Sequence, residues 1–213
     1  MRAVALLTLL LLGLARAGDA ATLEFWGFSP DGKYLAFEQY GVRDGSGFPY
    51  AELYVVEVGG NTLVAGANVV IQSERAGLRA ARQRALAQIQ AALRRYRIVR
   101  GNQGRFAGAV GKNSALQRLE FSSYTLELTT SDAPSPGNCL TDRPKLLELR
   151  LLTGRGERVL QRDRRLPASR ACAYDYQIHS VFVLGSSLAV FVQVTRDGFE
   201  GPDLRWMVVT ARL

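Results

Sequence analysis

The chain has 213 residues, with 27 Lys and Arg against 19 Asp and Glu, which gives a formal net charge of +8. It holds two cysteines and one histidine, so a site built from several thiolate or imidazole ligands is excluded. Hydrophobic residues make up 47% of the chain, and this length suffices for one domain with a substantial core.

Residues 1–17 have the form of a signal peptide. Arg2 precedes an apolar run over residues 3–14, and the sequence ARA at residues 15–17 is a small-x-small cleavage pattern. We expect cleavage after residue 17, or as late as residue 21. An uncleaved anchor is the alternative, but the run is shorter than the ~20 residues that a membrane span requires.

The expected mature chain, residues 18–213, is a single secreted or periplasmic domain. It keeps 25 cations against 19 acids and contains no stretch long and apolar enough to cross a bilayer. An exported basic protein meets phosphate chiefly as lipid head groups, lipopolysaccharide or wall polymers. We therefore expect no nucleic-acid role, and the partner to be an envelope protein or an anionic envelope component.

Residues 22–66 are expected to form an N-terminal β-unit. Ser29-Pro30-Asp31-Gly32 is turn chemistry, because Pro presets φ, Asp can bond its own backbone and Gly accepts positive φ. The aromatic and Val-rich runs at residues 34–40 and 53–58 predict two strands. The loop between them, residues 41–49, carries three Gly and a Pro and is expected to cross the surface.

This stretch resembles two known groups of proteins. Residues 28–37 (FSPDGKYLAF) are similar to the WD40-like repeat of Tol-system β-propellers, over about one blade. Further segments resemble a bacterial family of predicted secreted proteins of unknown function, namely residues 27–34, 38–41, 44–52, 198–203 and 208–213. The second resemblance spans nearly the whole mature chain. It implies a secreted protein and brings no assigned catalytic residues.

Residues 73–97 are expected to form one long amphipathic helix. The segment has no Pro and is rich in Ala, Arg, Gln and Leu, and Ser73 with Glu74 predicts its N-terminus. Its apolar side chains share one arc, and Arg82 within that arc is expected to reach its edge or to pair with an acid. The opposite arc carries Arg79, Arg84, Arg94, Arg95 and Arg97. A helix packed on a sheet with a solvated basic face is favoured; contact with an anionic membrane is the alternative.

A Gly-rich basic connector follows at residues 98–115. The sequence GKNS at residues 111–114 is similar to the end of a phosphate-binding loop. The upstream Gly of that motif would fall at Phe106, so the spacing fails and we expect a loop.

Residues 116–213 are expected to form a C-terminal β-unit. Strands are predicted at residues 119–130, 145–152, 157–161, 178–184, 187–195 and 205–211. Residues 182–191 repeat the strand–turn–strand pattern of residues 28–37, and a loop with Gly and Pro follows each, at residues 44–49 and 197–202. The predicted fold class is α+β, mainly antiparallel β, with two related β-hairpin units bracketing the helix.

Cys139 and Cys172 are expected to form a disulfide, because an even number of cysteines in an exported chain favours a bridge. Closing this loop would stabilise the fold by ~4 kcal/mol in the chain-entropy model. A redox or metal-ligating pair is the alternative, but the sequence has no CxxC spacing.

The sequence assigns no catalytic residue, no metal ligand and no cofactor. His179 has no second histidine or nucleophile elbow to support it, and we interpret it as structural. Acids in the two similar loops could form a calcium site or a carboxylate pair, and aromatic residues beside them a recognition patch. These candidate binding residues are Asp44, Phe48, Tyr50, Asp197, Phe199, Glu200, Asp203 and Trp206.

Three functions remain open at this stage. The favoured one is a non-enzymatic binding or interaction module of the cell envelope, since blade-like strands come without a catalytic set. The alternatives are a hydrolase that uses the loop carboxylates and a protein that binds anionic membranes through its Arg-rich helix.

Overall fold

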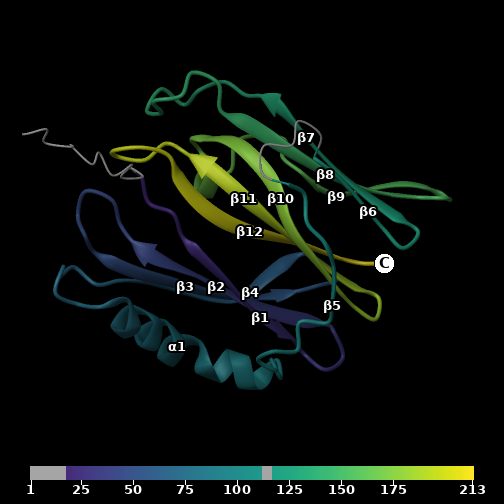
Figure 1. Ribbon diagram of the computed structural model, residues 1–213, viewed down its shortest axis with the longest axis horizontal. Helices are drawn as coiled ribbons and strands as arrows, with labels where there is room; N and C mark the ends of the chain where they lie inside the picture. Colours follow the sequence, from purple (N-terminus) through teal and green to yellow (C-terminus); the bar gives the residue numbers. More distant parts are fainter. Residues whose placement is uncertain (1–17, 112–116) are drawn as a thin grey trace, which may run out of the picture.

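The computed structural model describes residues 18–111 and 117–213, and the expected signal peptide lies outside the described residues. Four layers are stacked on one another: a helix and three antiparallel sheets (Figure 1). The helix-side sheet is a meander of β1 (Thr22–Phe28), β2 (Tyr34–Val42), β3 (Pro49–Glu57) and β4 (Thr62–Val70). Helix α1 (Leu78–Arg95) covers its outer face.

The other two sheets follow in the stack. The middle sheet has the order β12-β11-β10-β5 and consists of β5 (Arg105–Gly108), β10 (Ala173–Leu184), β11 (Ser187–Arg196) and β12 (Asp203–Arg212). The outer sheet is a second meander, of β6 (Arg118–Phe121), β7 (Tyr124–Asp132), β8 (Lys145–Thr153) and β9 (Gly156–Arg162). A short 3₁₀ helix, η1 (Ala168–Arg170), precedes β10.

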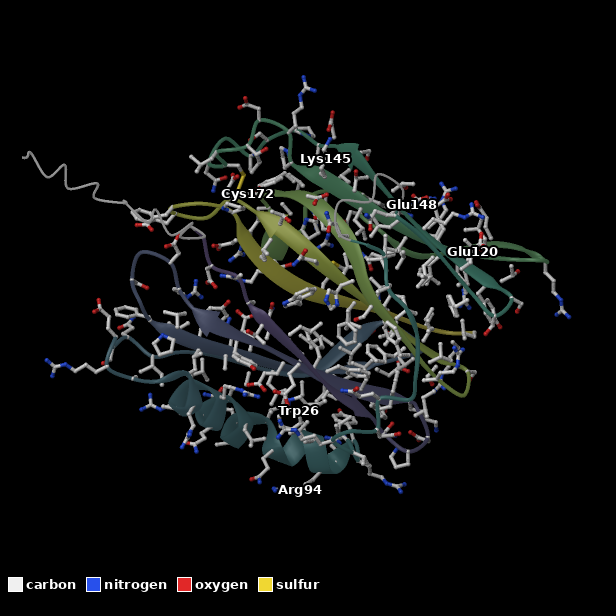
Figure 2. The ribbon with its side chains drawn as sticks, in the orientation of Figure 1. Trp26, Arg94, Glu120, Lys145, Glu148 and Cys172 are labelled. Atoms are coloured by element: carbon white, nitrogen blue, oxygen red, sulfur yellow. A yellow bond between two sulfur atoms is a disulfide. The ribbon has the colours of Figure 1, made fainter. Side chains whose placement is uncertain are left out.

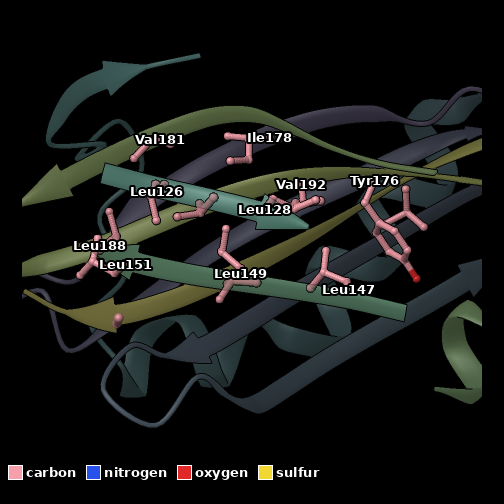
Figure 3. Packing of buried hydrophobic residues seen from close by; sticks show 14 of the residues in the cluster. Leu126, Leu128, Leu147, Leu149, Leu151, Tyr176, Ile178, Val181, Leu188 and Val192 are labelled. Atoms are coloured by element: carbon pink, nitrogen blue, oxygen red, sulfur yellow. The ribbon is translucent and has the colours of Figure 1, made fainter. Parts of the chain in front are cut away.

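Three hydrophobic clusters hold the layers together. Ala81, Ala85, Ile89 and Leu93 of α1 pack on the helix-side sheet. Aromatic residues dominate the cluster between the helix-side and middle sheets, where Phe191 lies 5.0 Å from Phe25 between ring centroids. Leu, Val and Ile side chains fill the space between the middle and outer sheets (Figure 3). The middle sheet is therefore apolar on both faces.

The turn predicted at residues 30–32 is confirmed. Ser29 Oγ donates to Asp31 Oδ1 at 2.7 Å and accepts from the Tyr34 amide at 3.0 Å. Gly32 has φ +66°, the left-handed conformation that glycine tolerates. Ser187 Oγ donates to the Gly32 carbonyl at 2.8 Å, so this turn is fastened to the tip of the β10–β11 hairpin.

The mainly antiparallel β architecture with one helix is confirmed, but the description as two hairpin units around a helix is not. Residues 28–37 and 182–191 do form the β1–β2 and β10–β11 corners, yet each corner belongs to a larger four-stranded sheet. The resemblance to a WD40-like propeller repeat is not supported. A Ser-Pro-Asp-Gly turn joins adjacent antiparallel strands in any meander, so it does not specify a propeller blade.

The helix begins five residues later than the sequence predicts. Its N-cap is Gly77, with extended φ and ψ and no side-chain cap, whereas Ser73 lies in a preceding turn in which the Ala76 amide donates to the Ser73 carbonyl at 3.1 Å. At the other end Arg97 has φ +54° and lies outside the helix. The helix begins only after Gly77, because glycine disfavours helical φ and ψ.

Three other boundaries also differ. The N-terminal β-unit continues to Val70 rather than residue 66. The connector contains β5, which pairs with β10, and its residues 112–115, together with residue 116, lie outside the described residues. The strand predicted at residues 119–130 is divided between β6 and β7 by a two-residue turn in which Ser122 has φ +51°. That turn has no Gly or Pro to mark it.

Replacing Gly32 with alanine is expected to lower the free energy of unfolding by about 2–3 kcal/mol. Positive φ costs alanine about 1–2 kcal/mol, and a Cβ at Gly32 would overlap the Ser187 hydroxyl. Gly154→Ala is the matched control, because no atom lies within 4 Å of the position that its added methyl group would take. Urea denaturation measures both variants; equal stability of the two would contradict the assigned role of this turn.

Candidate functional site

A cleft of about 660 Å³ opens between the helix-side and middle sheets, towards the edges formed by β4 and β12. We call it the interlayer cleft. Its lining comprises Phe37, Gln39, Arg43, Glu52, Tyr54, Val56, Asn61, Leu63, Asn68, Gln161, Ser169, Arg170, Val194, Arg196, Arg205, Trp206, Met207 and Val208. All three sheets and η1 therefore contribute to one site.

The cleft forms where the interface between the two sheets changes from aromatic to polar. Phe25, Phe28 and Phe191 fill the interface beside β1 and β2. Along the same face of β2 and β3 the next positions are Gln39 and Glu52, which are directly opposite in the strand register. Such side chains keep hydrogen bonds rather than close-packed contacts, so the sheets do not seal.

A hydrogen-bond network covers one wall of the interlayer cleft. Gln39 Nε2 and the Tyr54 hydroxyl both donate to Glu52 Oε2, at 2.7 and 3.0 Å, and the Trp206 amide donates to Gln39 Oε1 at 2.8 Å. Burial, followed by the charge of Glu52, raises the pKa of Tyr54 far above its usual value. The Tyr54 hydroxyl is therefore a permanent donor.

Asn61 closes the opposite end of the same wall. Its Oδ1 accepts from the Thr210 amide of β12 at 2.9 Å, and its Nδ2 donates to Gln161 Oε1 of β9 at 3.2 Å. Gln39 and Asn61 thus bond backbone amides of β12, the edge strand of the middle sheet. Side chains that occupy an edge in this way hinder unwanted strand pairing.

Two of the four arginines in the interlayer cleft are structural. Arg170 forms an ion pair with Asp163 at 2.7 Å, and both side chains are nearly buried. Arg205 forms one with Asp19 at 2.5 Å, and the Tyr50 hydroxyl donates to the same carboxylate at 2.9 Å. Burial raises the pKa of Asp19, although Arg205 and Tyr50 act against it.

The other two arginines retain hydrogen-bonding capacity. Arg196 reaches Asp203 at 3.4 Å, and its buried Nε has no hydrogen-bond partner. Arg43 lies 5.4 Å from the centroid of the Tyr50 ring and forms no ion pair within residues 18–111 and 117–213. Two guanidinium groups of the cleft are thus incompletely paired within the described residues.

These two arginines begin the two similar loops, which we call the paired loops: residues 43–48 and 196–202. Each opens with Arg-Asp-Gly, at residues 43–45 and 196–198. The structure brings the loops together, because the Glu200 amide donates to Asp44 Oδ2 at 2.9 Å and the Phe199 ring lies against Gly45. The similarity of these loops is visible in the sequence, but their arginines were not among the predicted site residues. The repeated Arg-Asp-Gly tripeptide was the signal that could have identified them.

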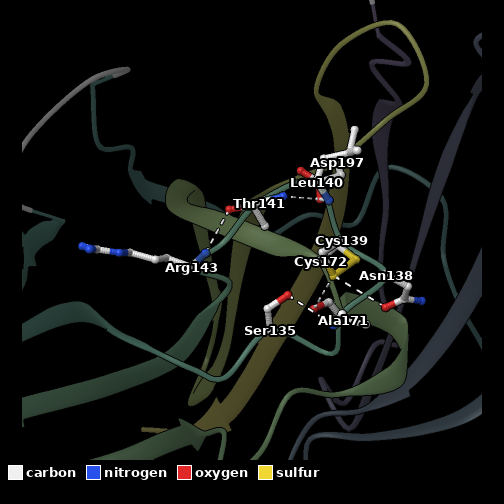
Figure 4. The surroundings of a disulfide bond; sticks show 10 residues. Ser135, Asn138, Cys139, Leu140, Thr141, Arg143, Ala171, Cys172 and Asp197 are labelled. Carbon is white, nitrogen blue, oxygen red and sulfur yellow. Dashed lines mark hydrogen bonds between the residues drawn. A yellow bond between two sulfur atoms is a disulfide. The ribbon is translucent and has the colours of Figure 1, made fainter.

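Three of the four predicted loop acids, Asp44, Asp197 and Asp203, bond groups of the protein through their carboxylates. Asp197 Oδ2 accepts from the amides of Leu140 and Thr141 at 2.6 and 3.0 Å (Figure 4). Asp203 lies between Arg196 and Arg205, and its Oδ1 accepts from the Asp19 amide at 3.2 Å. Asp44 and Glu200 meet at the loop contact described above. The carboxylates of Asp44, Asp197 and Asp203 thus fasten the loops.

The predicted aromatic patch is divided by the structure. Phe199 is 79% exposed, whereas Tyr50 is 1% exposed and belongs to the core. Phe48 is partly buried. Trp206 lines the interlayer cleft, with its ring 4.6 Å from that of His179. His179 Nδ1 lies 3.1 Å from Ser180 Oγ, but Ser180 is buried, which does not favour a nucleophile.

The predicted disulfide between Cys139 and Cys172 is confirmed (Figure 4). It links the β7–β8 loop of the outer sheet to the segment just before β10. Among the described residues, Cys139, Cys172 and Asp197 are the one cluster of metal-ligating types, but both sulfurs are in the disulfide. No thiolate is left there to hold a metal.

The five helix arginines named from the sequence are all exposed: Arg79, Arg84, Arg94, Arg95 and Arg97. Arg94 points away from the sheets (Figure 2). Arg82 instead pairs with Glu38 at 2.7 Å and with Glu24. The helix arginines lie on the face of the helix-side sheet opposite the interlayer cleft, so the structure separates these two sets of candidate residues.

Together the fold and the disulfide define a β-rich domain suited to an oxidising compartment. The chain belongs to the family described as "Predicted secreted protein (DUF2259)", whose profile matches residues 36–212. The predicted location outside the cytoplasm is thereby confirmed. No curated protein and no solved structure matches the chain. No helix among the described residues is long and apolar enough to cross a membrane.

The mature protein is predicted to begin at Gly18. Cleavage as late as residue 21 would remove Asp19, and Arg205, which is 8% exposed, would lose its nearest carboxylate. Asp203, 3.3 Å from Arg205, would remain as its carboxylate partner among the described residues. Removing one member of a buried ion pair costs up to about 3–5 kcal/mol. N-terminal sequencing of the exported protein measures the cleavage site; a mature chain that lacks Asp19 would contradict this assignment.

The Asp163–Arg170 pair predicts a specific dependence of stability on pH. Burial alone would raise the pKa of Asp163, but hydrogen bonds and charge from Arg170 outweigh it and lower the pKa below 3.8. The stability that this carboxylate contributes is therefore complete above pH 3.8 and is lost as the pH falls through the lowered value.

Asp163→Asn is accordingly expected to cost about 3 kcal/mol at neutral pH, and the difference from the wild type should shrink below about pH 3.8. Urea denaturation at both pH values measures this. Asp132→Asn, which breaks an exposed pair with Lys145, is the control and should have little effect. An Asp163→Asn deficit of the same size at both pH values would contradict the linkage.

Proposed function

We propose that this secreted protein is a non-enzymatic binding protein whose interlayer cleft holds a ligand with a carboxylate or phosphate group. One observation carries the proposal: the two paired loops place Arg43 and Arg196 in one cleft, where Arg196 has one ion pair, to Asp203 at 3.4 Å, and Arg43 has none within the described residues. Planar guanidinium groups match carboxylate and phosphate oxygens in a bidentate geometry.

The size and the walls of the interlayer cleft support the same proposal. Its volume of about 660 Å³ lies within the ~300–1,000 Å³ range of small-molecule sites. Trp206, Leu63 and Met207 supply apolar surface beside the polar groups. A ligand with an anionic group and an apolar portion therefore fits this lining best.

A hydrolase that uses the loop carboxylates has less support. Asp44 and Asp197 each accept hydrogen bonds from backbone amides, so their Oδ2 atoms are engaged within the protein. The contacts at these residues support a role in holding the paired loops.

Tryptophan fluorescence tests the proposal, since Trp206 lines the interlayer cleft and Trp26 lies in the core under α1. Citrate and pyrophosphate are suitable anionic probes. We expect them to change the emission of the wild type and to have no such effect on Trp206→Phe.

Arg196→Gln is then expected to raise the dissociation constant at least about tenfold, because charge-assisted hydrogen bonds contribute ~1.5–3 kcal/mol. Arg155→Gln, which removes the same charge from an exposed turn of the outer sheet, is the matched control. Equal affinities of the two variants would contradict a ligand held by Arg196.

A further inference from the structure

The charges of the chain are strongly segregated. Residues 18–74 carry eight acids and two cations, whereas residues 75–117 carry ten cations and no acid. The second stretch contains α1, which is the outermost layer on its side of the molecule (Figure 1). Five of these ten cations lie on α1 itself, and no acid does.

Only the cations that face the sheet are neutralised. Arg82 pairs with Glu24 and Glu38, and Arg100 pairs with Glu24. The remaining cations on the helix and its flanks are exposed and form no ion pair within the described part of the chain. These residues, which we call the basic helix face, are Arg75, Arg79, Arg84, Arg94, Arg95 and Arg97.

The stability of the helix does not account for this arrangement. Arg94 and Arg95 in the last turn complement the negative end of the helix dipole. Arg79 in the first turn opposes the positive end, and that turn has no acid. A helix selected for its own stability would carry Asp or Glu there, so an external partner is the better explanation of these cations.

The partner is polyanionic and is contacted at its surface. The apolar arc of α1 is used by the helix-side sheet, and the outward arc holds Arg, Gln and Ala with no large apolar side chain. The helix itself therefore has no apolar face left to insert into a hydrocarbon layer. At its C-terminal end, a hollow places Arg94 and Arg97 beside Pro30, Ile98 and Val99, and Val99 is 45% exposed.

We propose that the basic helix face docks the protein on the surface of an anionic phospholipid bilayer. The arginines contact lipid phosphates, and the hollow beside Arg94 and Arg97 lies next to these contacts. Because these contacts are electrostatic and exposed, docking is reversible and weakens with salt. The interlayer cleft lies across the helix-side sheet from this face, so the docked protein keeps its cleft accessible.

Cosedimentation with vesicles tests this proposal. Vesicles of phosphatidylcholine alone are compared with vesicles that also contain phosphatidylglycerol, which makes their surface anionic. The wild type is expected to bind the anionic vesicles only, and to be released as the salt rises from about 0.05 M to about 0.5 M, where the Debye length falls severalfold.

Two triple variants with the same net charge separate a specific face from general attraction. The test variant is Arg79→Gln, Arg84→Gln and Arg94→Gln; the control is Arg155→Gln, Arg164→Gln and Arg165→Gln, three exposed arginines in and just after the last hairpin of the outer sheet. We expect the test variant to lose binding about a hundredfold, at about fivefold per arginine, and the control to stay within a few fold of the wild type.

Thermal melting followed by circular dichroism tests whether either triple variant loses binding because it unfolds. We expect both to melt at nearly the wild-type temperature, because all six side chains are exposed. Equal losses in the two variants would overturn the proposal, because they would show attraction by net charge alone. Absence of wild-type binding to anionic vesicles would also overturn it, and binding to an acidic polysaccharide in that case would reassign the basic helix face to a wall polymer.

Discussion

Burial of the middle sheet on both faces is the constraint on which the rest of this structure depends. Along β11, Val190 and Val192 face the outer sheet, and Ala189 and Phe191 face the helix-side sheet. A strand that is covered on both faces has a nearly continuous apolar sequence, and residues 188–192 (LAVFV) have such a sequence. Each fully buried side chain of this kind contributes about 1.5–3 kcal/mol, so neither flanking sheet can be removed without exposing a large apolar surface.

The stack also determines where function can reside. The helix-side and middle sheets meet through aromatic rings beside β1 and through hydrogen-bonded polar groups towards β4 and β12, so a cleft remains on the polar side. Disulfide and hydrogen bonds tie the paired loops and the β7–β8 loop at one end of the stack. Rigid elements thereby position Arg43 and Arg196, which is what a preorganised site requires.

Local chemistry explains which features the sequence predicts. The turn at residues 30–32, the disulfide and the hairpin around residues 153–156 follow from Gly, Pro, Asp and Cys placement, and the apolar arc of α1 follows from its periodicity. The turn at Ser122 escaped prediction because its two serines are a weak turn signal without Gly or Pro beside them. Pairing of β5 with β10 escaped because it joins segments far apart in the chain.

The candidate site shows the same limit. Similar loops at residues 44–49 and 197–202 are visible in the sequence, yet their contact depends on how two sheets stack. Acids in these loops drew attention as potential ligands, whereas the structure uses them to bond backbone amides. The arginine before each acid faces the interlayer cleft, and only the three-dimensional arrangement distinguishes the two roles.

Native-state hydrogen exchange, read peptide by peptide in the disulfide-intact protein, tests the central role of the middle sheet most directly. The account predicts that amides of β10 and β11 exchange most slowly, with the free energy of global unfolding, and that β6 and β9 of the outer sheet open earlier. Faster exchange in β11 than in the outer sheet would contradict the account. The middle sheet could then open while the sheets that flank it stay folded.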